Sequence, residues 1–324
     1  MGKNLRIVFF GTPDFAVASL EALVDGGYNV VGVVTATDKP AGRGHKIMYS
    51  AVKEYALKKN LRLLQPEKLK SQEFIEELQS LNADLQIVVA FRMMPKEVYS
   101  MPRLGTFNLH GSLLPKYRGA APIHWAVING EKETGITTFL LNDKIDEGEI
   151  IFQHKISISN EETTGELYER MMKEGGKLVI ETVEAIARNS YTPIPQTNLD
   201  KKPCLAPKIY KETTYIPWHK NGAEIVNFIR GMCPFPCANT IFIGQKTALE
   251  LSFKVYKAQF YQINHNKKIG LVEMNIKDGI RVFCKDGFVQ LIDIQLSGKK
   301  RMLANDFLRG VKIEDIYQVI DKKN

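Results

Sequence analysis

The sequence has few cysteines and no long apolar run. Its four cysteines are Cys204, Cys233, Cys237 and Cys284, and no second pair or histidine follows Cys233 and Cys237 at zinc-ligand spacing. We therefore expect ordinary reduced thiols in a cytosolic protein and no metal site. No segment approaches the roughly 20 apolar residues that a membrane-spanning helix needs, and the run Ile7–Phe10 is too short for the core of a signal peptide. These absences predict a cytoplasmic protein that does not associate with a membrane.

The chain also lacks internal repeats, low-complexity tracts and the glycine-rich fingerprint of dinucleotide-binding proteins. The turn after its first predicted strand reads Phe10-Gly11-Thr12-Pro13, with one glycine where G-x-G-x-x-G has three. Dinucleotide binding is therefore disfavoured, and we interpret the segment as a tight turn into a helix.

Apolar segments that alternate with amphipathic ones organise the first part of the chain. Strands are predicted at residues 5–10, 30–37, 61–66 and 84–91, and helices at residues 15–27, 49–59 and 71–81. Strands that alternate with helices indicate a parallel sheet with right-handed crossovers, and continuous apolar runs suit strands covered on both faces. We therefore expect an α/β domain with a Rossmann-like parallel sheet.

The second part has a different pattern, and a length of 324 residues already favours two domains. A helix is predicted at residues 222–232, and short strands at residues 239–244, 248–260, 268–275, 279–287 and 288–296. Five or so short strands with Gly, Asn and Asp turns indicate a small OB-like β-barrel. Between the two parts, prolines at positions 193, 195, 203 and 207 interrupt any periodicity. We therefore expect domains at 1–192 and 211–324, joined by a linker at 193–210.

The positive charge is concentrated at one end of the sequence. Residues 207–324 carry 19 Lys and Arg against 11 Asp and Glu, which accounts for the whole net charge of +8. A neutral first part and a basic second part are typical of a catalytic domain joined to one that holds a polyanion. A basic surface kept for solubility explains the charge alone equally well.

A second basic segment, Asp38-Lys39-Pro40-Ala41-Gly42-Arg43-Gly44-His45-Lys46, follows the second predicted strand. Its glycines and its three cationic side chains, Lys39, Arg43 and Lys46, fit a mobile arm that grips phosphates. A solvated loop with incidental charge is the alternative.

The most informative segment is FNLHGSLLPKYRG at residues 107–119. Asn108 and His110 are two residues apart at the end of an apolar run, so in a strand their side chains point to the same face. Asp146 follows in IDEGEII, next to a turn at Gly148. An amide, an imidazole and a carboxylate can transfer an acyl group onto an amine, although a histidine near a strand end is more often structural.

Three longer motifs carry a family resemblance. They are FGTPDFAV at 10–17, KPAGRGHK at 39–46 and HGSLLPKYRGAAPIHWAVINGEKETGITTFLLNDKIDEGEI at 110–150. With PKIYKETTYIPW and IRGMCPFP further on, the chain resembles the methionyl-tRNA formyltransferases, a branch of the 10-formyltetrahydrofolate-dependent formyltransferase family. The resemblance covers nearly the whole chain. It implies formyl transfer from 10-formyltetrahydrofolate, as co-substrate, to the amino group of methionyl initiator tRNA, without a metal.

The resemblance also implies roles for individual residues. Asn108, His110 and Asp146 form the catalytic group: Asn108 and a protonated His110 donate to the oxyanion, and Asp146 orients the imidazole and accepts the proton of the amine. The folate contacts implied are Ser112, Leu113, Leu114, Pro115, Phe91 and Met93. The tRNA contacts implied are Arg43, Lys39 and Lys46, with further lysines of the basic barrel. We expect a monomer.

Two positions depart from the family pattern. Arg92 stands where other members have glycine beside the expected pterin site, and Lys144 replaces a glycine before Asp146. Three alternatives remain at this point. They are a formyltransferase that acts on a small amine, a hydrolase that releases formate, and a non-catalytic RNA-binding protein. The basic segment and the basic barrel disfavour the first two, and the intact catalytic group disfavours the third.

Overall fold

The computed structural model describes residues 1–41, 46–311 and 315–320. The chain divides into two compact units. The first unit comprises Met1–Gly119, Glu133–Ser157 and Tyr168–Ala206, and the second comprises Ala120–Lys132, Ile158–Leu167 and the chain from Pro207 onward.

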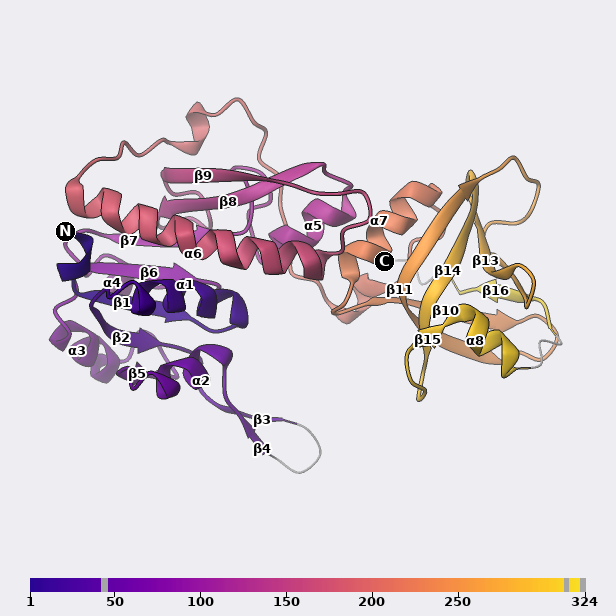
Figure 1. Ribbon diagram of the computed structural model, residues 1–324, viewed down its shortest axis with the longest axis horizontal. Coiled ribbons are helices and arrows are strands. Elements are labelled where there is room, and N and C mark those ends of the chain that lie inside the picture. Colours follow the sequence, from indigo (N-terminus) through magenta and orange to yellow (C-terminus); the bar gives the residue numbers. More distant parts are fainter. Residues whose placement is uncertain (42–45, 312–314, 321–324) are drawn as a thin grey trace. The chain divides into compact units, whose positions relative to one another are not determined.

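A seven-stranded sheet forms the centre of the first unit, in the order β5-β2-β1-β6-β7-β8-β9 (Figure 1). Its strands are β1 (Ile7–Gly11), β2 (Val30–Val34), β5 (Leu63–Leu64), β6 (Leu85–Val89), β7 (Thr106–His110), β8 (Glu133–Leu140) and β9 (Ile150–Ser157). The first five in spatial order are mutually parallel, which confirms the predicted Rossmann-like sheet. Strands β8 and β9 extend it in antiparallel fashion, and the first of them lies directly beside β7.

Helices pack on both faces of this sheet. They are α1 (Asp14–Asp25), α2 (Ala51–Lys58), α3 (Gln72–Ser80), α4 (Lys96–Tyr99) and the long α6 (Thr164–Arg188), whose first residues belong to the second unit. The residues of α3 join a buried cluster with Phe10 and Val88. On the other face, α6 approaches α1 so closely that a Cβ at Gly176 would lie 3.1 Å from the Ala18 carbonyl oxygen.

The basic segment after β2 forms a two-stranded hairpin, β3 (Lys39–Ala41) and β4 (Lys46–Met48), which projects from the unit (Figure 1). Arg43 lies outside the described residues. At the base of the hairpin, Lys53 Nζ lies 2.5 Å from Asp38 Oδ2, and Gln65 Nε2 donates to Asp38 Oδ1.

The proline-rich segment that follows α6 is tied to the first unit as far as Ala206. Ile194 and Ile150 exchange two backbone hydrogen bonds of 2.9 Å. Further along, Arg118 N donates to Cys204 O, and Ala206 N donates to Arg118 O. This segment therefore crosses the surface of the first unit as a bonded strap, which we define as residues 190–206.

The second unit is built around a β-barrel. Its strands are β10 (Ala238–Gly244), β11 (Glu250–Gln262), β12 (Leu271–Asn275), β13 (Gly279–Cys284), β14 (Gly287–Leu296), β15 (Met302–Leu303) and β16 (Tyr317–Val319), and its helices are α5 (Pro122–Ile128), α7 (Gly222–Met232) and α8 (Ala304–Arg309). These strands pair with one another in antiparallel fashion, and pairing of β11 with β14 closes the barrel. The predicted barrel is thus confirmed. The short strands β15 and β16 were not predicted, because two or three residues carry no periodic pattern.

The barrel has its own hydrophobic core. Phe242 and Phe253 pack at 5.2 Å between ring centroids, and Trp218 donates its indole N–H to Thr240 Oγ1 at 3.0 Å. A buried indole needs such a partner, so Trp218 is held in a single orientation.

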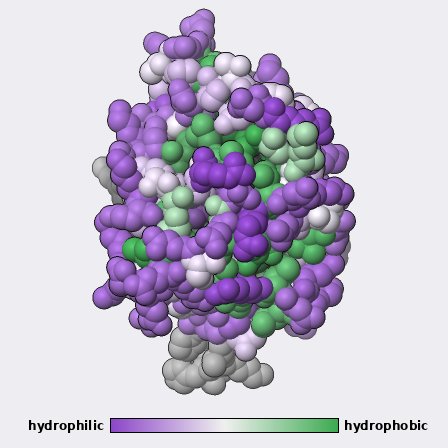
Figure 2. Space-filling model, turned by 90° about the vertical axis from the view of Figure 1, so that its left-hand side faces the viewer, coloured by the Kyte–Doolittle hydropathy of each residue, from purple (hydrophilic) through white to green (hydrophobic). Residues whose placement is uncertain are grey.

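The face in Figure 2 is mostly hydrophilic, with smaller apolar areas between the charged groups. Among the helices of the described residues, none is long and apolar enough to cross a membrane. The four cysteines are free thiols in this structure.

Candidate active site

Strand β7 carries the two polar side chains of the predicted catalytic group. In register, Asn108 lies beside Val88 of β6 and opposite Phe139 of β8, and His110 lies opposite Thr137. Both side chains therefore emerge at the carboxyl edge of the parallel strands, on the same face. Sites in open α/β sheets assemble at this edge.

Asn108 has an unusual hydrogen-bonding state. Its Oδ1 is buried and has no partner among the described residues. Leaving a buried polar atom unpaired costs about 1–3 kcal/mol, so such an atom in a folded protein calls for an explanation. The amide can present either its oxygen or its NH₂ group, and it is therefore suited to a ligand with an adjacent donor and acceptor.

His110 is oriented by a backbone carbonyl. The ring is 6% exposed, and its Nε2 lies 2.8 Å from the carbonyl oxygen of Tyr117. Because a carbonyl can only accept, Nε2 carries the hydrogen, and Nδ1 is the nitrogen that faces Asp146. The distance from Nδ1 to Asp146 Oδ2 is 3.9 Å. The sequence did not predict the part played by Tyr117, because a main-chain carbonyl has no sequence signature.

Asp146 is held from two sides in a left-handed conformation, with φ of 53°. Its Oδ2 accepts a hydrogen bond of 2.8 Å from the backbone N–H of Gly119, and its carbonyl oxygen accepts one of 2.8 Å from Gln196 Nε2. The turn that follows depends on Gly148, since a Cβ there would lie 1.6 Å from Leu140 O. The loop between β8 and β9 is thus closely fixed beside His110.

The residues expected to contact folate after β7 are buried. Ser112 is 0% exposed and donates to Lys116 O at 2.6 Å, while its own carbonyl accepts from Thr137 Oγ1. Leu113, Leu114 and Pro115 are buried as well, and Leu114–Pro115 is a cis peptide. In the structure these residues anchor the segment after β7 to β8.

The other predicted folate contacts follow β6. Phe91 packs edge-on against Phe10, with 5.6 Å between centroids, whereas Met93 is 71% exposed. The guanidinium of Arg92 lies 5.7 Å from the Phe91 ring and donates to the carbonyl oxygens of Pro66 and Glu67. Arg92 therefore fastens this segment to the chain after β5.

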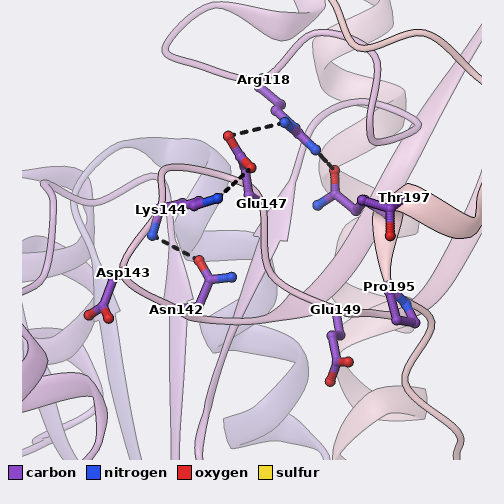
Figure 3. Close-up of a pocket in the computed structure, with 9 residues that line it drawn as sticks. Arg118, Asn142, Asp143, Lys144, Glu147, Glu149, Pro195 and Thr197 are labelled. Carbon is purple, nitrogen blue, oxygen red and sulfur yellow. Dashed lines mark hydrogen bonds and ion pairs between the residues drawn. The ribbon is translucent and has the colours of Figure 1, made fainter.

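A pocket of about 330 Å³ adjoins the loop of Asp146 (Figure 3). It is lined by Arg118, Asn142, Asp143, Lys144, Glu147, Glu149, Pro195, Gln196 and Thr197. Figure 3 shows Lys144 turned toward Glu147, and their charged atoms are 4.0 Å apart. The backbone N–H of Lys144 donates to Asn142 Oδ1 at 2.9 Å, so the non-glycine residue is accommodated in a turn closed by a side chain.

Groups of three or more His, Cys, Asp or Glu side chains that could hold a metal ion do not occur within the part of the chain that the structure describes.

Comparisons with known proteins identify the family of this chain. Residues 5–183 match the formyl transferase family, and residues 208–312 match the formyl transferase C-terminal domain. The methionyl-tRNA formyltransferase of Bacteroides thetaiotaomicron is 50% identical over 98% of this chain and 99% of its own length. That of Flavobacterium johnsoniae is 51% identical over 97% of this chain and 98% of its own.

Among solved structures, the fold resembles the N-formyltransferase of Helicobacter canadensis, crystallised with folinic acid and dTDP-3-aminofucose. The TM-score is 0.61, at 21% identity over 91% of this chain and all of the other. HypX of Aquifex aeolicus, in complex with tetrahydrofolic acid, has a TM-score of 0.61 at 17% identity, covering 97% of this chain and 50% of HypX. Those two likenesses concern the fold, whereas the full-length identities near 50% identify the family. The chain belongs to the methionyl-tRNA formyltransferase family.

Proposed function

We propose that the protein transfers the formyl group of 10-formyltetrahydrofolate to the amino group of methionyl initiator tRNA. The observation that carries this proposal is the placement of the Asn108 amide, whose buried Oδ1 has no partner within the described part of the chain, on the same strand face as His110, whose Nδ1 lies 3.9 Å from Asp146 Oδ2. The full-length identity of about 50% to methionyl-tRNA formyltransferases supports the choice of acceptor.

The reaction is a direct attack. The neutral amine of the methionyl group bonds to the formyl carbon, and the carbonyl electrons move to oxygen. An amide N–H of Asn108 donates to this oxyanion, and a protonated His110 adds a donor from Nδ1. Asp146 takes the proton of the amine, directly or through a water molecule. Collapse of the oxyanion then breaks the bond to N10 of the folate, which leaves as N10–H with the proton that Asp146 had taken from the amine, directly or through the same water molecule.

The hydrogen-bond pattern around the imidazole supports this division of roles. Because Tyr117 O occupies Nε2–H, only Nδ1 of His110 is turned toward Asp146. Any proton exchanged between the His110 ring and the Asp146 carboxylate therefore passes through Nδ1. All three groups come from one chain, so we propose that the protein acts as a monomer.

For the co-substrate, we propose that Ser112, Leu113, Leu114 and Pro115 shape the folate site through their backbone, since their side chains are buried. Phe91 and Met93 follow the adjacent strand β6, and the exposed thioether of Met93 is available to a bound ring.

For the tRNA, we propose that Lys39, Arg43 and Lys46 contact the acceptor arm and that the barrel follows the phosphate backbone. Lys254 and Lys257 are exposed on β11. The guanidinium of Arg301, in contrast, is already engaged within the barrel. Its Nη2 donates to Asp293 Oδ2 at 2.7 Å, and its central carbon lies 4.0 Å from the centroid of the Tyr256 ring. Substrates of this kind imply a cytoplasmic protein.

The test is to incubate the protein with labelled 10-formyltetrahydrofolate and methionine-charged initiator tRNA, and to count formyl groups on the tRNA. We expect transfer to initiator tRNA and little to elongator methionyl-tRNA or uncharged tRNA. Release of formate without transfer, or formylation of a free small amine, would contradict the proposed acceptor.

A further inference from the structure

Gln196 is a buried polar residue in the strap (residues 190–206), where the sequence predicts only a linker. It begins a short 3-10 turn, Gln196–Asn198, and is 5% exposed. A buried amide needs partners for its two N–H groups and its oxygen, so its partners reveal what it holds.

The amide nitrogen of Gln196 bridges the loop that carries Asp146. Nε2 donates to Asp146 O at 2.8 Å and to Gly148 O at 2.9 Å. These two carbonyls lie on either side of Glu147, so a single side chain fixes the backbone both at Asp146 and beyond it.

The amide oxygen of Gln196 is in turn fixed by Arg118. Arg118 donates to Oε1 from Nε at 3.1 Å and from Nη2 at 2.7 Å, and its Nη1 lies 3.2 Å from Glu147 Oε1 (Figure 3). Arg118 precedes Gly119, whose N–H donates to the carboxylate of Asp146. One network therefore holds both the backbone and the carboxylate of Asp146.

Asp146 needs this support because of its conformation. Its φ of 53° lies in the left-handed region, which non-glycine residues retain only when their surroundings impose it. A relaxed loop would carry the carboxylate away from His110 Nδ1. Misplacement of a catalytic group by about 1 Å can cost about 100-fold in rate.

We infer that Gln196 is a positioning residue for formyl transfer, acting through the backbone of Asp146 and itself held by Arg118. This inference rests on the proposed function. It makes the strap part of the active-site framework.

The experiment compares steady-state formyl transfer by Gln196→Met, Gln196→Glu and the control Asn198→Ala, an exposed neighbour in the same turn. Methionine keeps the length and loses every hydrogen bond. An ionised glutamate keeps the contact with Arg118 but cannot donate to the two carbonyls. Gln196→Glu therefore tests the inference even if Gln196→Met does not fold. We expect kcat to fall about 10- to 100-fold in both variants. KM for both substrates and the activity of Asn198→Ala should stay within about twofold of wild type.

A double-mutant cycle separates positioning from a general structural effect. In an Asp146→Asn background, Gln196→Glu should change the single-turnover rate by less than about twofold. The inference is overturned if both variants keep wild-type kcat, or if the loss is equally large in both backgrounds. Absence of transfer by the wild-type protein would instead refute the proposed function, so the two failures are distinguishable.

Discussion

At the scale of single residues, the site combines one unsatisfied group with two that are tightly held. Asn108 Oδ1 has no partner among the described residues, whereas His110 and Asp146 are each fixed by main-chain groups. Groups that are fixed in advance in this way can act on developing charge without having to reorient. The positions of His110 and Asp146 therefore depend on the main-chain groups of Tyr117 and Gly119.

Gly148→Ala should damage the site, because its Cβ would lie 1.6 Å from Leu140 O. The loop must shift, and we expect a loss of about 1–3 kcal/mol in the free energy of unfolding together with a fall in kcat. Gly310→Ala is the matched control, since its Cβ would come no closer than 3.7 Å to another atom. If Gly148→Ala has the same free energy of unfolding and the same transfer rate as this control, the geometry of the turn is contradicted.

At the scale of elements, the starts of β1 and β6 are joined by Asp84. Its carboxylate accepts from the backbone N–H of Arg6 at 2.8 Å and from Arg103 Nε at 2.7 Å. The Arg6 hydrogen bond, helped by the Arg103 guanidinium, lowers the pKa of Asp84 against the opposing effect of partial burial. Because the folded-state pKa is below the unfolded one, the contribution to stability is complete above pH ~4 and is lost as the pH falls through the folded-state pKa.

Asp84→Asn should therefore lower the free energy of unfolding at pH 7 by about 2 kcal/mol. The difference from wild type should shrink as the pH is lowered below ~4. Thermal unfolding followed by circular dichroism from pH 7 to pH 3 measures both effects, with exposed Asp200→Asn as the control. A difference that stays constant with pH would show that Asp84 does not act through its charge.

The elements also show what a sequence can predict. The strands at 5–10 and 84–91 and the face shared by Asn108 and His110 follow from apolar runs and a period of two. The contribution of Gln196 could not be predicted, because the strap has no periodicity and is held by individual hydrogen bonds. The orientation of His110 depends on a carbonyl, which every residue has.

At the scale of the whole molecule, charge and chemistry are separated along the chain. Residues 1–206 hold the candidate catalytic group and have no net charge, whereas residues 207–324 carry the entire excess of +8. A polyanion bound by the basic part releases counterions, so its affinity falls with salt. The steps that depend on folate should be much less sensitive to the salt concentration.

Accordingly, the logarithm of KM for methionyl-tRNA should rise linearly with the logarithm of salt concentration. Lys254→Gln and Lys257→Gln should each reduce the slope by about 1 if each lysine neutralises one phosphate. Lys177→Gln on α6 controls for loss of a surface charge elsewhere, since Lys177 pairs with Glu174. If the slope of log KM against log salt concentration is unchanged in both barrel variants, β11 does not contact the tRNA.

The most direct test of the account is the single-turnover rate of formyl transfer by Asn108→Ala, at saturating 10-formyltetrahydrofolate and methionyl initiator tRNA. Loss of the oxyanion donor should slow the reaction by about 100- to 1,000-fold, with both dissociation constants close to wild type. A wild-type rate in Asn108→Ala would contradict the assignment of catalysis to the end of β7.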